Sequence, residues 1–142
     1  VLDLRLDILR AVDILVVNES EAAALATRLA LSAADAHTLA GALGTAVIVT
    51  LGEQGAQTCS AGRAWRTPAL HIDAVDTTGA GDAFVGVLAA ALDRGLPLDQ
   101  AVRRGCVAGG LACRAMGAQA ALPDSAAIDA GLRQLGPDRP LP

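Results

Sequence analysis

Lysine and tyrosine are both absent from this chain of 142 residues, which contains one phenylalanine and one tryptophan. Because all eleven basic residues are therefore arginine, a phosphate-binding loop of the Walker A type, which requires a lysine, is excluded. A formal net charge of -4 is unfavourable for binding to nucleic acids or anionic membranes. The scarcity of aromatic rings also argues against base-stacking nucleic-acid modules. We therefore expect neither nucleic acid nor membrane as a partner.

Cysteine is also sparse, with three residues at Cys59, Cys106 and Cys113. Their number is odd and their spacing is not that of a metal site, so we expect buried, reduced thiols and a cytoplasmic location. No uncharged run reaches the length of a membrane-spanning helix without glycine or polar residues. Charged residues interrupt the first seven positions, which is not typical of a secretory signal. Because the chain starts at Val1 instead of methionine, we expect it to be part of a longer polypeptide.

The remaining composition is that of a well-buried globular chain, with 53% hydrophobic and 18% charged residues. Strand-like and helix-like patterns alternate along the sequence. Such alternation favours an α/β domain with right-handed crossovers, a largely parallel sheet and an antiparallel edge hairpin. We expect one domain over residues 1–142, with strands at 13–17, 46–51, 56–59 and 64–67, an alternating segment at 70–75, and helices at 4–11, 21–28, 32–44, 83–92, 99–116 and 125–135.

Polar residues follow the first predicted strand directly. Asn18 and Glu21 fall at its carboxyl end, and this end of the strands is the usual ligand side of an open α/β sheet. Serine is a favoured helix cap, so we expect Ser20 and Ser32 to cap the next two helices. Asn18 and Glu21 are therefore candidates for ligand binding, with an ordinary helix start as the alternative.

The sequence DTTGAGDAFVGVLAAAL, at residues 76–92, is the stretch around which the chain is organised. Gly79 and Gly81 allow a sharp turn and close approach of a ligand to the backbone. The turn leads into an apolar helix, whose free amides and dipole would bind an anion. Asp82 lies in the first helical turn, where it could orient or deprotonate a hydroxyl that attacks a phosphate. The alternative is a tight turn with an acidic helix start.

Four features in this order resemble those of the ribokinase-like carbohydrate kinases of the PfkB family, in the C-terminal half of those enzymes. The resemblance covers almost the whole chain. It implies a three-layer α/β/α fold that is present only in part, because the N-terminal half with its sugar-binding residues and β-lid is missing. The features are Asn18-x-x-Glu21, Val49-Thr50-Leu51-Gly52-x-x-Gly55, Asp76-Thr77-Thr78-Gly79-Ala80-Gly81-Asp82-Ala83-Phe84 and Gly117-Ala118-Gln119.

The glycine-rich motif carries the chemistry that the resemblance implies. Asp82 corresponds to the catalytic base, which accepts the proton of a substrate hydroxyl as its oxygen attacks the γ-phosphorus of ATP. Gly79, Ala80 and Gly81 correspond to an anion hole, in which backbone amides stabilise the charge on the transferred phosphoryl group. The resemblance thus predicts ATP-dependent phosphotransfer to a hydroxyl of a sugar or sugar-like small molecule.

Two other motifs imply contacts with the nucleotide and with Mg²⁺. Asn18 and Glu21 resemble the family's organiser of Mg²⁺ and phosphate, a role that suits a carboxylate acting through water. Thr50, Gly52 and Gly55 resemble its nucleotide-binding turn. For Asn18 and Glu21 the alternative is the N-cap region of a solvated helix. For Thr50, Gly52 and Gly55 an ordinary hairpin turn explains the residues equally well.

The long predicted helix at 99–116 contains Gly109 and Gly110, although glycine costs about 1 kcal/mol relative to alanine in a helix. They indicate close approach of another backbone or of a flat ligand. By resemblance, Cys106 would line the adenine site, with plain helix packing as the alternative.

The resemblance also implies a monovalent-cation site. Position 121, where relatives offer a hydroxyl, is Ala121, which leaves activation by K⁺ open. The site would use the carboxylate of Asp76 and the carbonyls of Thr78, Ala112, Ala115 and Gly117.

Two further hypotheses compete with a sugar kinase. A non-catalytic nucleotide-binding or regulatory fragment would keep the scaffold without turnover. A dinucleotide-binding oxidoreductase is disfavoured, because Phe84 stands where a small residue is needed and Asp82 would repel the pyrophosphate. Since the acceptor-binding half lies outside the chain, we expect the isolated piece to be inactive, and the acceptor stays open. A homodimer also stays open, because dimers of this family usually form through the lid.

Overall fold

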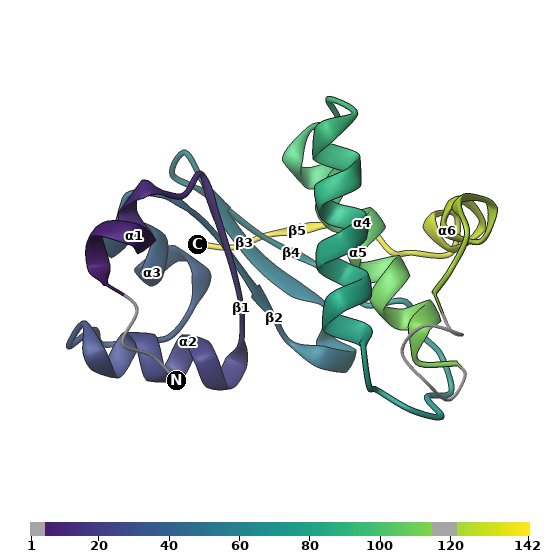
Figure 1. Cartoon of the computed structure of the whole chain (residues 1–142), viewed down its shortest axis with the longest axis horizontal. Helices are drawn as coiled ribbons and strands as arrows, with labels where there is room; N and C mark the ends of the chain where they lie inside the picture. Colours follow the sequence, from purple (N-terminus) through teal and green to yellow (C-terminus); the bar gives the residue numbers. More distant parts are fainter. Residues whose placement is uncertain (1–4, 115–121) are drawn as a thin grey trace. The chain divides into compact units, whose positions relative to one another are not determined.

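The computed structural model describes residues 5–114 and 122–142 (Figure 1). The chain divides into two compact units. Unit 1 comprises Val1–Leu51, Ala56–Arg66 and Asp138–Pro142, and unit 2 comprises Gly52–Gly55 and Thr67–Pro137.

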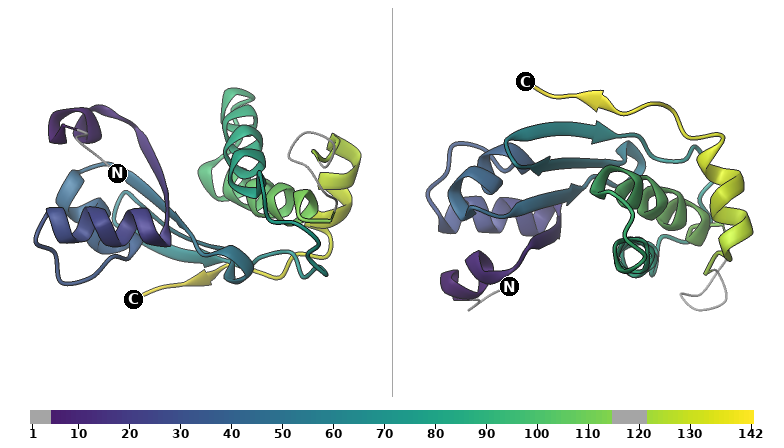
Figure 2. Two further views of the ribbon diagram at one scale, coloured as in Figure 1. Left: turned by 60° about the horizontal axis from the view of Figure 1, so that its bottom comes forward. Right: turned by 90° about the horizontal axis from the view of Figure 1, so that it is seen from above.

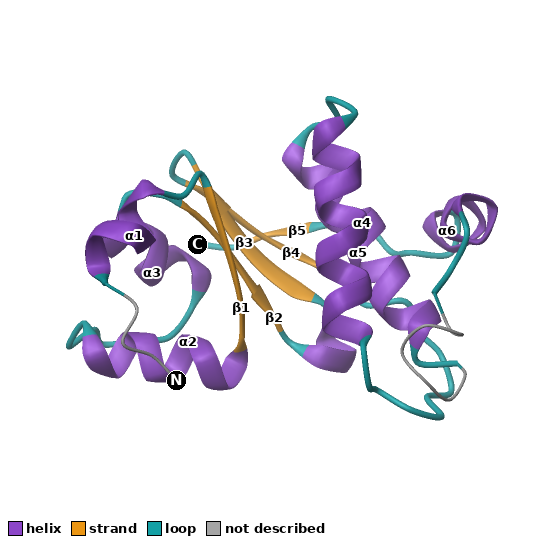
Figure 3. Ribbon diagram, in the orientation of Figure 1, coloured by secondary structure: helices purple, strands orange, loops and turns teal. Residues whose placement is uncertain are grey.

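A five-stranded sheet forms the centre of unit 1, with the strands in the order β1-β2-β3-β4-β5 (Figure 3). The first two strands are parallel, with Asn18 opposite Thr50 at their carboxyl ends. β2 pairs antiparallel with β3, and β4 pairs antiparallel with β5. The sheet is therefore mixed, with more antiparallel pairing than the expected edge hairpin. The strands are β1 (Ile14–Asn18), β2 (Ala46–Thr50), β3 (Ala56–Ser60), β4 (Arg63–Thr67) and β5 (Arg139–Pro140).

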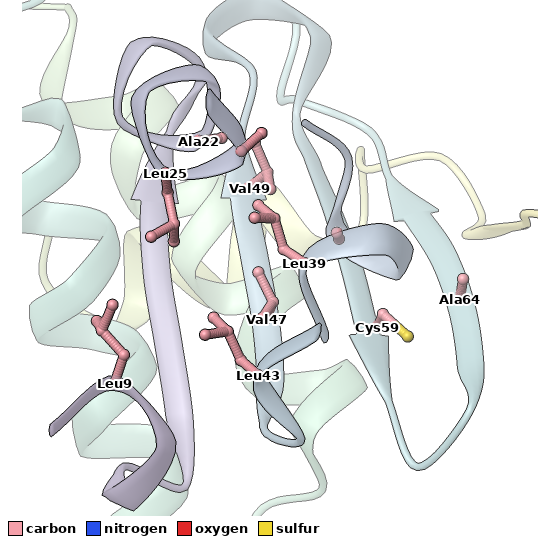
Figure 4. Packing of buried hydrophobic residues seen from close by; sticks show 11 residues of the cluster. Leu9, Ala22, Leu25, Leu39, Leu43, Val47, Val49, Cys59 and Ala64 are labelled. Atoms are coloured by element: carbon pink, nitrogen blue, oxygen red, sulfur yellow. The ribbon is translucent and has the colours of Figure 1, made fainter. Parts of the chain in front are cut away.

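Three helices of unit 1 pack on the sheet with their apolar faces: α1 (Leu6–Ala11), α2 (Glu19–Arg28) and α3 (Ala36–Leu43). Val47 and Val49 of β2 are at most 2% exposed within this core. The intervening Ile48 is fully buried as well, as expected for a strand that is apolar on both faces. Figure 4 shows the leucines that the helices pack against β1 and β2, namely Leu9, Leu25, Leu39 and Leu43.

The predicted serine caps were wrong. Asn18 caps α2 and Asp35 caps α3, each accepting a hydrogen bond from a backbone amide of the first turn. Ser20 instead lies inside α2, and Ser32 precedes the start of α3 by several residues. In both helices the cap is therefore the side-chain oxygen of the residue directly before the first turn, an amide oxygen in α2 and a carboxylate oxygen in α3.

Unit 2 is helical, with the short 3₁₀ turn η1 (Gly52–Gln54) and the helices α4 (Ala80–Asp93), α5 (Leu98–Ala112) and α6 (Ser125–Leu132). α4 and α5 pack against each other, as Figure 2 also shows. The alternating segment at 70–75 forms no strand. Leu70 instead lies in an apolar cluster with Val107, Ala108, Ile128 and Leu135.

Glycines of α5 allow the close contact between α4 and α5. A Cβ added at Gly105 would lie 3.0 Å from the ring of Phe84, and one at Gly109 would lie 3.2 Å from the carbonyl oxygen of Ala80. At Gly110 the neighbour would be the side chain of Leu70, at 3.1 Å. The glycines were expected to allow close approach either of other protein atoms or of a flat ligand. The structure shows the close approach of protein atoms. No helix in the part of the chain that the structure describes is long and apolar enough to cross a membrane.

Candidate active site

The carboxyl ends of the two parallel strands hold the first group of candidate residues, in unit 1. Asn18 ends β1 and Thr50 ends β2, and the two residues are direct neighbours in the parallel register. The Thr50 hydroxyl donates a hydrogen bond of 3.4 Å to the carbonyl of Val17. This is the edge of the sheet at which ligands bind in open α/β folds.

Asn18 and Glu21 form a complete capping box at the start of α2. The Asn18 side chain accepts from the Glu21 amide at 2.9 Å, and Oε2 of Glu21 accepts from the Asn18 amide at 2.9 Å. The hydroxyl of Ser20 donates to Asn18 Oδ1 at 2.7 Å. Asn18 and Glu21 therefore do stabilise the start of a helix, as the alternative interpretation predicted. A role in ligand binding would be a second role for the same residues.

The turn after β2 contains two glycines with different surroundings. Gly52 has a φ of 54° and Gly55 a φ of 88°, which both favour glycine. A Cβ at Gly55 would collide with the backbone of residues 67–69, so the fold itself requires glycine there. A Cβ at Gly52 would meet no atom within 4 Å, so its open side is available to a ligand.

The loop before α4 is held by backbone contacts to the end of α5. The amides of Val75 and Asp76 donate to the carbonyl of Cys113 at 2.8 and 3.3 Å, and Asp76 Oδ1 accepts from the Thr78 amide at 2.9 Å. Burial, together with the nearby negative charge of Asp76, raises the pKa of the Cys113 thiol. Nothing in the sequence pointed to Cys113 as the anchor of this loop, because the contact uses its backbone.

The expected cation site is described only in part. Asp76, Thr78 and Ala112 fall in the described part of the chain, whereas Ala115 and Gly117 lie outside the described residues. The Gly117-Ala118-Gln119 motif also lies outside them. Within the residues that are described, no group of three or more histidine, cysteine, aspartate or glutamate residues could hold a metal ion.

The glycine turn begins α4 without a side-chain cap. Gly79 is the N-cap residue, with a φ of 81°, and within the described residues the helix start has no side-chain capping hydrogen bond. The Ala80 amide donates to the carbonyl of Thr77 at 3.2 Å, and the Ala83 amide donates to that of Gly79 at 2.9 Å. Over residues 5–114 and 122–142, the intervening amides of Gly81 and Asp82 have no backbone acceptor.

The first turn of α4 is also accessible. Asp82 is exposed, and it does not point into packed hydrocarbon. A Cβ at Gly81 would meet no atom within 4 Å. Two amides at the positive end of a helix dipole thus lie beside an exposed carboxylate, an arrangement that can bind an anion and accept a proton.

Cys106 lies in α5 and is only 6% exposed. Its burial agrees with helix packing, and its role next to adenine stays a prediction.

Comparison with known proteins connects this geometry to a family. The model of the pfkB family carbohydrate kinases matches residues 2–125. The ribokinase of Lactococcus lactis subsp. lactis is 32% identical over 130 residues, which cover 92% of this chain and 42% of that protein. The chain therefore spans less than half the length of this relative.

Solved structures give the same result for the fold. A ribokinase from Thermotoga maritima matches with a TM-score of 0.85 and 31% identity, over 92% of this chain and 46% of that one. The ribokinase of Arabidopsis thaliana, solved with ribose and ATP, matches with a TM-score of 0.77 and 26% identity, over 91% and 43%. The ribokinase-like α/β fold is thereby confirmed for a partial domain. This chain belongs to the pfkB family of carbohydrate kinases.

Proposed function

We propose that this chain is the nucleotide-binding and catalytic-base half of an ATP-dependent kinase that phosphorylates a hydroxyl of a sugar or sugar-like molecule. The main support is the start of α4, where the amides of Gly81 and Asp82, which have no backbone acceptor among the described residues, adjoin the exposed Asp82 carboxylate. Membership of a carbohydrate kinase family supports the same assignment.

In the proposed reaction, the acceptor oxygen attacks the γ-phosphorus of ATP, and the bond to the β-γ bridging oxygen breaks to release ADP. Asp82 accepts the proton of the attacking hydroxyl. The backbone at Gly79, Ala80 and Gly81 stabilises the negative charge of the moving phosphoryl group. Because the Ala80 amide already donates to Thr77, we assign the larger share to the amides of Gly81 and Asp82.

Mg²⁺ and ATP fit the residues at the ends of β1 and β2. Mg²⁺ keeps several waters and usually takes one or two carboxylates plus phosphate oxygens, so it does not need a three-residue protein cluster. Glu21 would bind it through water while its Oε2 stays in the capping box, and Asn18 would orient the phosphates. When bound, the ion neutralises charge on the phosphates.

The remaining assignments concern the nucleotide and a monovalent ion. Thr50, Gly52 and Gly55 would form the turn beside the nucleotide, and Cys106 would contact adenine. K⁺ would bind at Asp76 with carbonyls of the same loop and of the end of α5. We assign a cytoplasmic location to the kinase, and a homodimer stays compatible with this proposal.

Nucleotide binding tests the first half of the proposal. We expect the chain to bind Mg·ATP in titration calorimetry and to transfer no phosphate to any sugar, because the acceptor-binding half is missing. Turnover by the 142 residues alone would contradict the fragment assignment, and absence of nucleotide binding would contradict the nucleotide site.

The alternative is a non-catalytic nucleotide-binding fragment. This alternative is favoured if the longer protein binds Mg·ATP but transfers phosphate only at the background rate, and if removing the Asp82 carboxylate by substitution does not change that rate. The amides of Gly81 and Asp82 and the exposed Asp82 carboxylate argue against it, because within residues 5–114 and 122–142 the amides have no backbone acceptor and the carboxylate caps no helix.

A further inference from the structure

The glycine turn and the start of α4 are held by α5 at two points. The first is the carbonyl of Cys113, which accepts from the amides of Val75 and Asp76 at 2.8 and 3.3 Å. The second is Gly109, one helical turn earlier, where an added Cβ would lie 3.2 Å from the carbonyl oxygen of Ala80. The Cys113 thiol donates to the Gly109 carbonyl at 3.2 Å, which joins the two points. α5 therefore contacts the chain both before and after the glycine turn.

The contact at Gly109 involves the peptide group that carries one of the proposed anion-binding amides. The carbonyl of Ala80 and the amide of Gly81 belong to the same planar trans peptide, so they point in opposite directions. The carbonyl side lies against α5, whereas Gly81 is exposed, and a Cβ added there would meet no described atom within 4 Å. The distance between α5 and α4 therefore fixes the direction in which the Gly81 amide points.

The absence of a side chain at position 109 makes this distance possible. A Cβ at 3.2 Å from the Ala80 oxygen would be closer than ordinary van der Waals contact, so the oxygen would have to move by a few tenths of an ångström. A backbone oxygen cannot rotate away as the end of a flexible side chain can. Because Val75 and Asp76 are fixed to Cys113, the turn cannot follow as a rigid body, and the first peptide of α4 would tilt instead.

We propose that Gly109 is a positioning residue of the phosphotransfer site, which holds the Ala80–Gly81 peptide so that the Gly81 amide can bind the moving phosphoryl group. The inference rests on the proposed function for the role of that amide. Groups that act on a transition state must be held to within about 0.5 Å of the productive geometry. A methyl group at position 109 would therefore change the rate while leaving the fold intact.

Gly105 provides a comparison in the same pair of helices. It lies one turn before Gly109, and an added Cβ would be equally close to α4, at 3.0 Å from the ring of Phe84 and 3.2 Å from its carbonyl oxygen. That carbonyl shares its peptide with the amide of Val85, inside α4. The two glycines thus make similar packing contacts, but only Gly109 contacts a peptide at the open end of the helix.

A role in helix packing alone is the competing explanation. In that case, alanine at position 105 or 109 would change the free energy of unfolding, and the two variants would have the same catalytic properties. The tests below therefore compare the two substitutions and measure the Gly81 amide directly.

The first test uses Gly109→Ala and Gly105→Ala in the 142-residue chain without nucleotide. We would record the ¹⁵N–¹H resonance of the Gly81 amide, with thermal unfolding as the measure of stability. We expect Gly109→Ala to move this resonance by more than its line width and Gly105→Ala to leave it in place. An unmoved resonance in Gly109→Ala, or equal movement in both variants, would overturn the proposal. Failure of Gly109→Ala to fold would also overturn it, because the glycine would then be a requirement of the fold.

The second test is steady-state kinetics of the longer kinase that we propose. We expect Gly109→Ala to lower kcat and kcat/KM equally, by about 3- to 10-fold, because a contact of the transition state is weakened. KM for ATP should change by less than about twofold, and Gly105→Ala should keep kcat to within about twofold. Equal kcat values in the two variants, or a raised KM for ATP without a loss of kcat, would overturn the proposal.

Failure of the proposed function would be seen in the unsubstituted chain. If its Gly81 resonance does not respond to Mg·ATP, the amide binds no phosphate, and the inference falls together with the proposed function. If the unsubstituted chain responds and Gly109→Ala responds identically from an unmoved resonance, only the role of Gly109 is wrong.

Discussion

Glu21 and Asp82 are both acidic residues in the first turn of a helix, but only Glu21 has a structural role in the helix start. In unit 1 the Glu21 carboxylate accepts from the Asn18 amide and completes a capping box. In unit 2 the Asp82 carboxylate is exposed and caps nothing, and α4 starts from a glycine without a side-chain cap. The first motif is thus explained by helix stability, whereas the second is not.

The same contrast holds for the backbone. At α2 the side chains of Asn18 and Glu21 satisfy amides that would otherwise lack an acceptor. At α4 the amides of Gly81 and Asp82 are left without a backbone acceptor in the described residues. Because unpaired amides at a helix start are normally capped, a start that leaves them free is the better candidate for binding an anion.

The largest effect should come from Asp82→Asn in the longer kinase that we propose. We expect kcat to fall by about 100- to 10,000-fold, because the base is lost, while the affinity for Mg·ATP is retained. Asp93→Asn, an exposed carboxylate at the other end of α4, is the matched control and should leave kcat unchanged. If steady-state kinetics show equally small changes in kcat for both substitutions, Asp82 is not the catalytic base and is only an acidic residue at a helix start.

Gly81→Ala should separate stability from activity. Both Gly81 and Gly86 lie in α4 with free space where a Cβ would be, so alanine should stabilise the helix at either position by up to about 1 kcal/mol. Only Gly81→Ala should lower kcat, by about 10- to 100-fold, because a methyl group would displace the phosphate from the amides. Thermal unfolding and steady-state kinetics measure the two effects, and loss of activity in Gly86→Ala would contradict this assignment.

Glu21→Gln tests whether Glu21 does more than cap α2. Glutamine can also complete a capping box, so we expect the free energy of unfolding to change by less than about 0.5 kcal/mol. The Mg²⁺ concentration needed for half-maximal rate should rise about tenfold or more, because the charge is lost. Glu19→Gln, in the same helical turn but outside the box, is the control. If the Mg²⁺ concentration for half-maximal rate is unchanged in Glu21→Gln, Glu21 has no role in Mg²⁺ binding and only caps α2.

Asp35 offers the smallest effect, and it concerns a cap with no proposed ligand role. Partial burial by itself raises its pKa, but hydrogen bonds from the amide and hydroxyl of Thr38 outweigh this and lower the pKa below its usual value. The stabilisation is therefore present above the unfolded-state pKa, near 4, and is lost as the pH falls through the lower folded-state value.

Asp35→Ala should accordingly cost about 1 kcal/mol at neutral pH, and the difference from the wild type should shrink in acid. Asp35→Asn keeps a cap that does not titrate, so its stability should lack this part of the pH dependence. Urea unfolding at several pH values measures both variants, and a constant difference between Asp35→Ala and the wild type in acid would contradict the ionised cap.

The sequence predicted the features that depend on local patterns. The buried strand β2 follows from its run of β-branched residues, and the start of α4 with Asp82 in its first turn follows from the glycine turn and the apolar run behind it. The caps were misassigned because serine, asparagine and aspartate are similarly favoured, and the choice between them depends on where the preceding strand or loop ends.

Long-range contacts could not be predicted from local patterns. Residues 70–75 alternate like a strand but find no partner in the sheet, and instead Leu70 packs among the helices of unit 2. The contact of Val75 and Asp76 with the carbonyl of Cys113 joins backbone groups far apart in the sequence. The extra antiparallel pairing comes from β5, two residues at the end of the chain with no strand pattern of their own.

The most direct test of the free amides at α4 is their response to the terminal phosphates of ATP. We would record the amide resonances of the ¹⁵N-labelled 142-residue chain with Mg·ATP and with Mg·AMP. We expect the signals of Gly81 and Asp82 to shift with ATP and to stay in place with AMP. If both signals stay in place while ATP shifts resonances elsewhere in the chain, the turn does not bind the phosphate and the proposed chemistry is wrong.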